Sequence, residues 1–538
     1  MESAVASSLS IADPIREGIA SGWNVIDAST FPQDRTIEAD VVIVGTGAGG
    51  GTAAEILVDA GFSVVLVEEG PLQSSSDFRM REAEAYPALY QESAARKTRD
   101  KAISILQGRC VGGGTTVNWT SSFRTPAATL TTWARSFGVT GLSETELSPW
   151  FGKMEARLSI APWTVAPNAN NAVLSRGAAQ TGIHWGTIRR NVKSCWNLGY
   201  CGMGCPTNAK QSMLVTTIPR ALAGGATLLT RTRAMAFEWN GDRVRALNCL
   251  AMDATGTVPT ARKIVVRARA YVASAGAIGT PALLLRSRVP DPDARLGKRT
   301  FLHPTVVSAA VMEERIDGWS GAPQSVYSDH YLDTMPPEGP IGFKLEAPPI
   351  HPILTAITMP GFGVAHARKM QALPHMQVLI ALLRDGFHPD SPGGTVTLAS
   401  DGTPLLDYSL NDYLWDGARR ALVTMAELQF AAGAKSVTPV HGVGAAYSTI
   451  ADTRAAIAAF DLRPLVTTLV SAHVMGGAAL GPDPRTSVVD LRGRHHHLRN
   501  LHVLDGSLFP TSIGANPQLS IYAIVAKLAT DLAAALKS

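Results

Sequence analysis

Four residues near the N-terminus have the types and the spacing to bind a dinucleotide. Gly45, Gly47 and Gly50 stand at G-x-G-x-x-G spacing, and Glu68 ends the next apolar run. In that pattern the first glycine permits a tight turn, the second lets a pyrophosphate approach the backbone, and the third lets a helix pack against a strand. The acid can accept hydrogen bonds from a ribose 2′-OH, which argues against the 2′-phosphate of NADP and leaves NAD and FAD open.

The surrounding stretch, Ala39–Pro71, supplies the elements that such a site needs. It reads as a buried strand, a glycine turn, a helix closed by Gly61 and a second buried strand. The N-terminus of the helix presents free N–H groups and the positive end of the helix dipole to phosphates. An ordinary βαβ unit with chance glycines is the alternative, but the order of these elements favours dinucleotide binding.

A second glycine-rich segment, Gly108–Arg124, has the composition of a loop that contacts a ligand. Gly112–Gly114 are followed by Thr115, Thr116 and Asn118. Glycines let the backbone lie against a flat or charged ligand, and the hydroxyl and amide groups can donate to it. A plain flexible loop is the alternative.

A histidine and an asparagine near the C-terminus are the third candidate. His473 lies in the segment SAHVMGGAALG, and Asn516-Pro517 precede a long apolar run. Asn516 suits the N-cap of a helix and Pro517 its first residue, and the positive N-terminus of that helix can stabilise developing negative charge. A lone histidine in an apolar segment is more often a satisfied core residue, so His473 alone decides nothing.

The composition indicates a multidomain globular protein. The 538 residues are too many for one hydrophobic core, and 46% of them are hydrophobic while 17% are charged. The formal net charge of +4 is small for this length. We therefore expect no nucleic-acid partner.

The sequence predicts a cytoplasmic protein. Residues 1–23 lack the basic and apolar segments of a secretory signal. No run of about 18 apolar residues indicates a transmembrane helix, and the 5 cysteines do not suggest a disulfide scaffold. Peripheral membrane association stays open, because a sequence does not show apolar surface patches.

The cysteines of CWNLGYCGMGCPTNAK are the strongest metal-like cluster. Between Cys195, Cys201 and Cys205 the spacings are unlike the C-x-x-C pairs of a four-ligand structural zinc site. We therefore predict buried or free thiols and no metal site. His495–His497 are interpreted as a solvated connection, and His502 as a structural residue.

Strand and helix signals continue through the chain. Ala226–Phe237 predicts a strand, Arg262–Ser274 a strand pair, and Pro281 the first residue of a helix. In residues 311–465, strand-like runs and the D-G turn of SPGGTVTLASDGTPLLDYSL predict an antiparallel sheet.

Two segments resemble the signatures of the glucose–methanol–choline (GMC) oxidoreductases, which are FAD enzymes. GRCVGGGTTVNW is similar to the first signature. Ser274, Gly276 and Gly279 are similar to the start of the second, although Arg288 and Pro290 replace the two glycines at its end. The C-terminal segments around His473 and Asn516 resemble the same family, so the resemblance spans most of the chain.

The resemblance also indicates how the flavin is held. Some members bond it covalently through a histidine before the signature asparagine, and Val117 stands there, which implies non-covalent FAD. In one sugar-oxidising subgroup adjacent cysteines hold an iron–sulfur cluster, and Trp196 breaks that pattern here. His303, in the tripeptide LHP, matches a common family element without an assigned role.

The resemblance implies a site. His473 falls on the family's catalytic histidine and Asn516 on its second catalytic position. We predict that His473 is the base, since histidine accepts a proton near neutral pH, and that Asn516 positions the substrate oxygen. The residues predicted to contact FAD are Gly45, Gly47, Ala48, Gly50, Glu68, Gly108, Gly112, Gly113, Thr115, Asn118, Ala234, Asp505, Gly506, Asn516 and Pro517.

The predicted fold class is α/β, with a Rossmann-like FAD-binding domain and a substrate domain built on an antiparallel sheet. The predicted FAD-binding segments are 36–125, 212–307 and 466–538, the last of which also carries the catalytic residues. The predicted substrate-domain segments are 126–211 and 308–465.

The resemblance implies FAD-dependent oxidation of an alcohol. An apolar primary alcohol is favoured, as in the long-chain alcohol oxidase branch, with O2, a quinone or an electron-transfer protein as acceptor. The alternatives are a sugar or polyol dehydrogenase, a lyase or other non-alcohol reaction on the same scaffold, a non-catalytic flavoprotein, and an NAD dehydrogenase.

Overall fold

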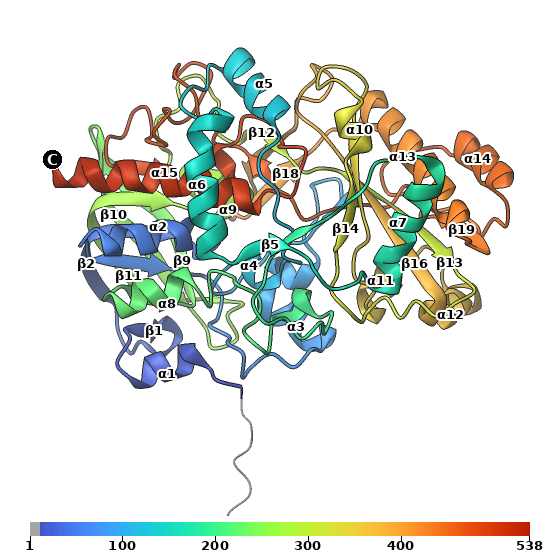
Figure 1. Ribbon diagram of the computed structural model, residues 1–538. Coiled ribbons are helices and arrows are strands. Elements are labelled where there is room, and N and C mark those ends of the chain that lie inside the picture. Colours follow the sequence, from blue (N-terminus) through green and yellow to red (C-terminus); the bar gives the residue numbers. More distant parts are fainter. Residues whose placement is uncertain (1–10) are drawn as a thin grey trace, which may run out of the picture.

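Two eight-stranded sheets organise the protein, each covered by helices (Figure 1). The computed structural model describes residues 11–538. Residues 1–10, which belong to the stretch considered for a secretory signal, lie outside the described residues.

The N-terminal βαβ unit forms as its sequence predicts. The apolar run before the glycines is β2 (Arg35–Val44), and α2 (Ala48–Asp59) begins directly after Gly47. After the turn at Gly61, the chain enters β3 (Val64–Val67). Glu68 therefore stands at the carboxyl end of β3, as predicted.

The first sheet is mainly parallel. Its order is β1-β8-β3-β2-β11-β10-β9, and β22 pairs with the end of β11. All neighbours are parallel except β10, which runs antiparallel to both β11 and β9. The remaining bounds are β1 (Val25–Asp27), β8 (Thr227–Thr230), β9 (Thr232–Asn240), β10 (Arg243–Met252), β11 (Pro259–Ala273) and β22 (Leu501–Val503).

Three local predictions in this domain were wrong. Ala226–Phe237 is two strands, because the chain breaks at Arg231, whose φ is +48°. The predicted strand pair is the single strand β11, whose first half pairs with β10 and whose buried end pairs with β22. Helix α9 (Gly276–Arg286) begins before Pro281, because Asp505 accepts a hydrogen bond from the backbone of Gly276 at the first turn.

The second sheet is the predicted antiparallel one. Its order is β4-β20-β13-β16-β15-β14-β6, with β19 also paired to β13, and only β4 and β20 are parallel neighbours. The bounds are β4 (Ile103–Ile105), β6 (Gly186–Thr187), β13 (Thr305–Val311), β14 (Val326–Ser328), β15 (Phe343–Glu346), β16 (Met376–Leu383), β19 (Ser436–Pro439) and β20 (Leu469–Ser471).

Residues 11–538 also form two smaller sheets. The D-G turn predicts a hairpin, and β17 (Gly394–Leu398) and β18 (Pro404–Asp407) confirm it. They continue into β12 (Lys298–Phe301) and β21 (Met475–Gly476). A separate pair joins β5 (Ile160–Pro162) to β7 (Arg189–Asn191).

Helices cover both sheets. α15 (Gln518–Lys537) packs against α2 and α6 (Glu144–Arg157), while α13 (Asp412–Ala431) packs against α7 (Ala169–Thr181), β13 and β16. The other α-helices are α1 (Pro14–Ala20), α3 (Glu82–Leu89), α4 (Gly114–Val117), α5 (Ala127–Phe137), α8 (Thr217–Ala223), α10 (His330–Asp333), α11 (Pro352–Thr358), α12 (Gly363–Gln371) and α14 (Ile450–Ala459).

Helix α15 differs from its prediction in two ways. Its N-cap is Pro517 and its first residue is Gln518, so Asn516 does not cap it. By length and composition it is also apolar enough to cross a membrane, although no transmembrane helix was predicted. Since 61% of its most apolar window is buried inside the fold, it serves as a core helix.

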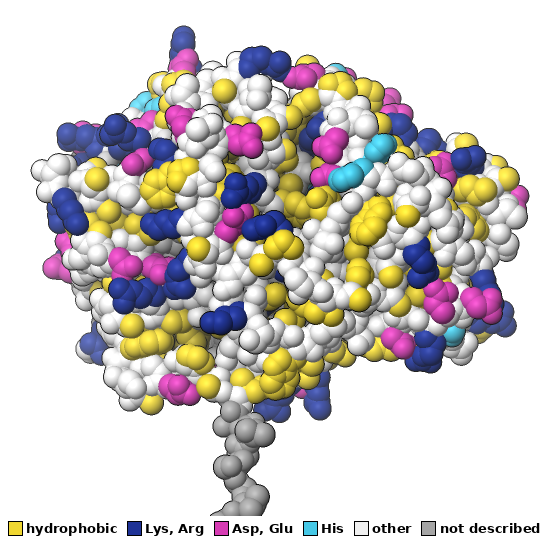
Figure 2. Space-filling model, viewed as in Figure 1, with side chains coloured by type: hydrophobic (Ala, Val, Ile, Leu, Met, Phe, Trp, Pro, Cys, Tyr) yellow, Lys and Arg dark blue, Asp and Glu magenta, His cyan; other side chains and the backbone are white. Residues whose placement is uncertain are grey.

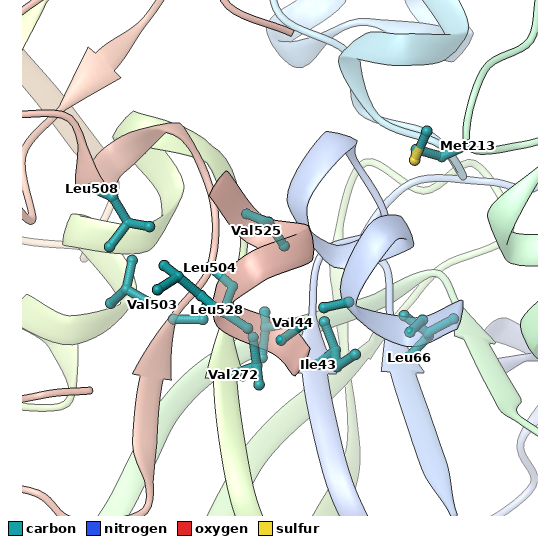
Figure 3. Close-up of a cluster of buried hydrophobic side chains, with 14 of the residues drawn as sticks. Ile43, Val44, Leu66, Met213, Val272, Val503, Leu504, Leu508, Val525 and Leu528 are labelled. Carbon is teal, nitrogen blue, oxygen red and sulfur yellow. The ribbon is translucent and has the colours of Figure 1, made fainter. Parts of the chain in front are cut away.

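The core of the first domain joins segments from both ends of the chain (Figure 3). Ile43 and Val44 of β2, Val272 of β11, Val503 of β22 and Leu528 of α15 pack together and are buried. β22 and α15 lie far from β2 in sequence, so the C-terminal segment completes the N-terminal domain.

The predicted domain boundaries stay predictions. Strands of the first sheet come from all three predicted FAD-binding segments. However, β4 and β20 lie within those segments and belong to the second sheet. β6, from the predicted substrate-domain segment 126–211, is also part of the second sheet. On the visible face, positive and negative side chains are interspersed with hydrophobic ones (Figure 2).

Candidate active site

A cavity of about 760 Å³ lies between the two sheets and collects most of the predicted site residues. Gly50 and Gly112 do not line it. The predicted residues on its wall are Gly45, Gly47, Ala48, Glu68, Gly108, Gly113, Thr115, Asn118, Ala234, His473, Asp505, Gly506, Asn516 and Pro517.

The glycine turn is shaped by close backbone contacts. Gly45 has a φ of +98°, and a Cβ there would lie 2.2 Å from the carbonyl oxygen of Ser274. A Cβ on Gly50 would lie 1.9 Å from the carbonyl oxygen of Gly45. A Cβ on Gly113 would lie 2.8 Å from Cα of Gly47, so the two glycine segments touch each other. Side chains at these positions would therefore disrupt this wall.

Glu68 is buried and holds the turn. Its carboxylate accepts hydrogen bonds from the backbone and hydroxyl of Thr46 and from the backbone of Gly70. Burial raises the pKa of this carboxyl. Glu69 beside it pairs with Arg109 and Arg233, which hold its pKa below the ordinary value despite burial.

The second glycine segment is tied down by its own polar side chains. The hydroxyl of Thr115 donates to the carbonyl of Gly112 at 2.6 Å, and Nδ2 of Asn118 donates to Oε1 of Gln518 at 2.7 Å. These groups have protein partners, and their predicted donation to a ligand stays a prediction. The segment is therefore an ordered wall, and Gln518 links it to the start of α15.

At the other end of the cavity, His473 lies between a histidine and an asparagine. Nδ1 of His473 is 3.3 Å from Nδ1 of His303, and its Nε2 is 3.5 Å from Nδ2 of Asn516. The backbone N–H of Gly514 donates to Nε2 of His303 at 3.1 Å. A neutral His303 therefore carries its proton on Nδ1, and this pattern assigns the proton of a neutral His473 to Nε2. In this tautomer Nε2 of His473 and Nδ2 of Asn516 are both donors, so their 3.5 Å contact is not a hydrogen bond, and Nδ2 donates to Glu346 instead.

Glu346 is a further acidic group of this cluster. It is fully buried on β15, and its Oε2 accepts hydrogen bonds from Asn516 at 3.2 Å and from Gln324 at 2.6 Å. Among the described residues, neither Oε1 of Glu346 nor Oδ1 of Asn516 has a hydrogen-bond partner. Such orphaned buried atoms indicate a group that binds something further.

Burial sets the protonation of the cluster. Desolvation lowers the pKa of His473 to about 4, with a contribution from the nearby Lys344, and lowers that of His303 well below its ordinary value. Desolvation raises the pKa of Glu346 to about 7, although Lys344 and Asn516 oppose the shift. Both histidines are therefore neutral at pH 7, whereas the carboxyl of Glu346 changes its charge close to neutral pH.

The cavity wall nearest the second sheet is apolar. β13 and β16 contribute Val307, Val378 and Ile380, and the α11 segment contributes Ile350 and Met359. The same residues belong to one buried hydrophobic cluster. This part of the cavity suits a hydrocarbon chain better than a polyhydroxylated ring.

Comparisons with known proteins agree with this arrangement. Two family profiles, both described as GMC oxidoreductase, match residues 86–305 and 389–525. The chain belongs to the GMC oxidoreductase family. It is therefore an oxidoreductase, and its cofactor is FAD.

The similar proteins include both named and uncharacterised members of the family. An uncharacterized GMC-type oxidoreductase y4nJ of Sinorhizobium fredii is 30% identical over 92% of this chain and 94% of its own. The long-chain-alcohol oxidase FAO4B of Arabidopsis thaliana is 28% identical over 92% of this chain and 68% of its own.

Solved structures share the fold. The pyridoxine 4-oxidase of Mesorbium loti matches with a TM-score of 0.67 and 20% identity, over 91% of this chain and 98% of its own. A formate oxidase of Aspergillus oryzae matches with a TM-score of 0.67 and 16% identity, over 93% of this chain and 99% of its own.

The residues on the cavity wall fit FAD. Gly47, the N-cap of α2, and Gly113 present backbone without Cβ atoms, which is how a pyrophosphate is held. Ala234, with its carbonyl turned to Arg286, lies on the same wall as Glu68. Asp505 accepts hydrogen bonds from Gly276 and Thr280 and so joins the C-terminal segment to the second family signature.

Several residues of the site were not predicted. His303 had no assigned role, and Glu346, Gln324 and Gln518 were not identified. Of these residues, the sequence pointed only to His303, because it stands in the tripeptide LHP that is common in the family. Glu346 lies between the two stretches that the family profiles match, where the FKLE run reads as an ordinary strand.

The cysteine segment packs against the second glycine segment. Within residues 11–538, Cys195, Cys201 and Cys205 are free and do not form a group of potential metal ligands. Lys210, buried beside them, donates to the carbonyls of Thr116, Asn118 and Cys201. The segment therefore anchors the second glycine segment.

The interpretation of the histidine run was wrong for one residue. His495 is 2% exposed rather than solvated, because Leu501 accepts a hydrogen bond from its backbone and draws it inward. His502 on β22 is buried, as expected of a structural residue.

Proposed function

We propose that the enzyme oxidises an apolar primary alcohol to the carbonyl compound, with non-covalent FAD as cofactor. The observation that carries this proposal is the meeting of His473 and Asn516 at the end of the cavity that has the apolar wall. FAD, when bound, supplies the acceptor for the hydride that leaves the alcohol carbon. The electrons then pass to O2, a quinone or an electron-transfer protein.

In this proposal Asn516 and His473 have different roles at the substrate oxygen. Asn516 binds and orients it, because an amide can donate a hydrogen bond but cannot take a proton at neutral pH. His473 is the base, and its depressed pKa keeps it neutral and able to accept a proton. The apolar wall excludes water around the reacting carbon.

The hydrogen bond from Gly514 to His303 limits when His473 can act as the base, because it determines the tautomers of both rings. Nε2 of His473 accepts a proton only when the ring's own proton lies on Nδ1, toward His303. His303 must then release its contact with Gly514. Glu346 is a second proton acceptor that has no such condition, since its pKa is near neutrality and one oxygen lacks a partner.

The experiment is anaerobic reduction of the bound flavin by a panel of alcohols, followed by admission of air. We expect bleaching by long-chain primary alcohols and little by sugars. Faster bleaching by sugars or polyols would identify the alternative substrate class, and no bleaching by any alcohol would favour a non-alcohol reaction. Rapid return of the yellow colour in air would identify O2 as an acceptor.

The long-chain-alcohol oxidases among the relatives support the substrate class, as does the apolar wall at Val378 and Ile380. Val117 supports non-covalent binding, because its side chain cannot form a bond to flavin. Mass spectrometry of the denatured protein tests this: we expect the chain alone, and a mass increased by that of FAD would contradict it.

A further inference from the structure

A helical hairpin beside the cavity lines it on one side and exposes hydrophobic side chains on the other. It consists of α11, the loop 359–362 and α12, which lie next to each other in Figure 1. On the inner face Leu354, Thr358 and Met359 line the cavity. On the outer side are large hydrophobic side chains exposed to solvent: Ile353 at 40%, Ile357 at 69%, Phe362 at 91% and Val364 at 70%.

The hairpin is held in this shape by polar contacts. Nε2 of His366 lies 2.9 Å from the carbonyl of Ala356, and Nζ of Lys369 donates to the carbonyl of Pro360 at 2.9 Å. The carboxylate of Glu82 accepts the first backbone N–H groups of α11, at 2.7 and 2.9 Å. The exposed hydrophobic side chains are therefore presented on an ordered support.

The charge of the hairpin has one sign. Residues 347–384 contain no aspartate or glutamate, and α12 carries Arg368 and Lys369 in its last turn. Glu82 below α11 is buried and already bonded to the hairpin. Glu314, near His375 at the far end, is paired with Arg176. Exposed apolar side chains flanked by cations match the surface of an anionic bilayer.

We propose that the outer face of this hairpin docks on a lipid bilayer with anionic headgroups. Its hydrophobic side chains enter the boundary between headgroups and acyl chains, and Arg368 contacts the headgroups. The advantage of this location rests on the proposed function: an apolar alcohol dissolves in the bilayer, and α11 carries residues of both this face and the cavity wall.

Vesicle flotation with the FAD-loaded full chain tests the proposal. The vesicles contain phosphatidylcholine alone or phosphatidylcholine with phosphatidylserine. We expect flotation that increases with phosphatidylserine and decreases with salt, and a loss of roughly tenfold or more in the double variant Ile357→Asp, Phe362→Asp. The matched control is Val258→Asp, a 58% exposed valine next to β11 in the other domain, which should float like the wild type.

Arg368→Gln tests the electrostatic part, since it should lose the preference for phosphatidylserine while keeping its bound flavin. Absence of flotation of the wild type on both vesicle types overturns the proposal. So does a wild-type dimer in gel filtration that Ile357→Asp, Phe362→Asp converts to a monomer, because the partner is then a second copy.

The two proposals fail separately. Wild-type flotation without flavin bleaching by any alcohol supports the docking surface and contradicts only the proposed substrate. Bleaching by a water-soluble primary alcohol without flotation supports the proposed function and contradicts the docking surface.

Discussion

The two ends of the cavity are built by different means. At the cofactor end, backbone atoms form the wall, and the contacts of Gly45, Gly50 and Gly113 leave no room for side chains. At the substrate end, side chains from distant segments form it, among them Val378, His473 and Asn516. His303 and Glu346 contact His473 and Asn516 from behind this wall. Substitutions that add atoms to a backbone wall disrupt its shape. Substitutions in a side-chain wall can change the substrate specificity while the shape of the cavity is kept.

The largest effect is expected from a side chain at the cofactor end. Gly45→Ala places a methyl group against the carbonyl of Ser274, 2.2 Å away, so the turn cannot keep its shape. We expect the purified protein to contain almost no flavin, measured by its visible absorbance. Gly61→Ala is the control: its φ of +94° is similar, but nothing lies within 4 Å. It should cost about 1 kcal/mol in stability and keep the flavin. Equal flavin loss in both would contradict the comparison.

At the substrate end the largest effect is expected from the base. His473→Ala should lower the rate of flavin bleaching by about 10²- to 10⁴-fold, the usual contribution of general base catalysis, with flavin content unchanged. The exposed His184, changed to alanine, is the control. Full turnover of His473→Ala would show that the base assignment is wrong.

The pH dependence of flavin bleaching distinguishes His473 from Glu346 as the base, and the expected effect is smaller. Burial raises the pKa of Glu346 to about 7, so its proton-accepting form appears as pH rises through 7. If Glu346 takes the proton, bleaching should increase about tenfold from pH 6 to pH 8, and Glu346→Gln should abolish the increase. His473, with a pKa of about 4, is neutral throughout this range and gives a flat profile.

Stability measurements provide an independent check on Glu346. Because the folded pKa is raised, the folded state binds more protons than the unfolded state between about pH 4.5 and pH 7. Its stability should therefore decrease as pH rises through that window, and Glu346→Gln should remove the decrease. Glu84→Gln, an exposed change on α3, is the control. Identical pH dependence of wild type and Glu346→Gln would show that the pKa is ordinary.

The smallest effect is expected from the apolar wall. Val378→Thr keeps the volume but places a hydroxyl against the substrate chain, which should raise KM for long-chain alcohols several-fold, since about 1 kcal/mol is lost. KM for short alcohols and the flavin content should stay the same. Equal changes for both chain lengths would show that Val378 does not contact the substrate chain.

The elements whose signals are local were predicted well. β2, α2 and β3 follow from apolar runs and glycines, and the β17–β18 hairpin follows from its turn. Two of the errors arose where a distant segment determines the local geometry. Helix α9 starts early because of Asp505, and Asn516 turns to Glu346 instead of capping α15.

The sequence by itself determined the dinucleotide-binding unit, since glycine spacing acts through local backbone conformation. The resemblance of short motifs added the family and the position of His473. Only the tertiary structure brought His303, Glu346 and the apolar wall to His473, and only it showed the outer face of the hairpin. These depend on contacts between segments far apart in the chain, and such pairings leave no pattern in a single sequence.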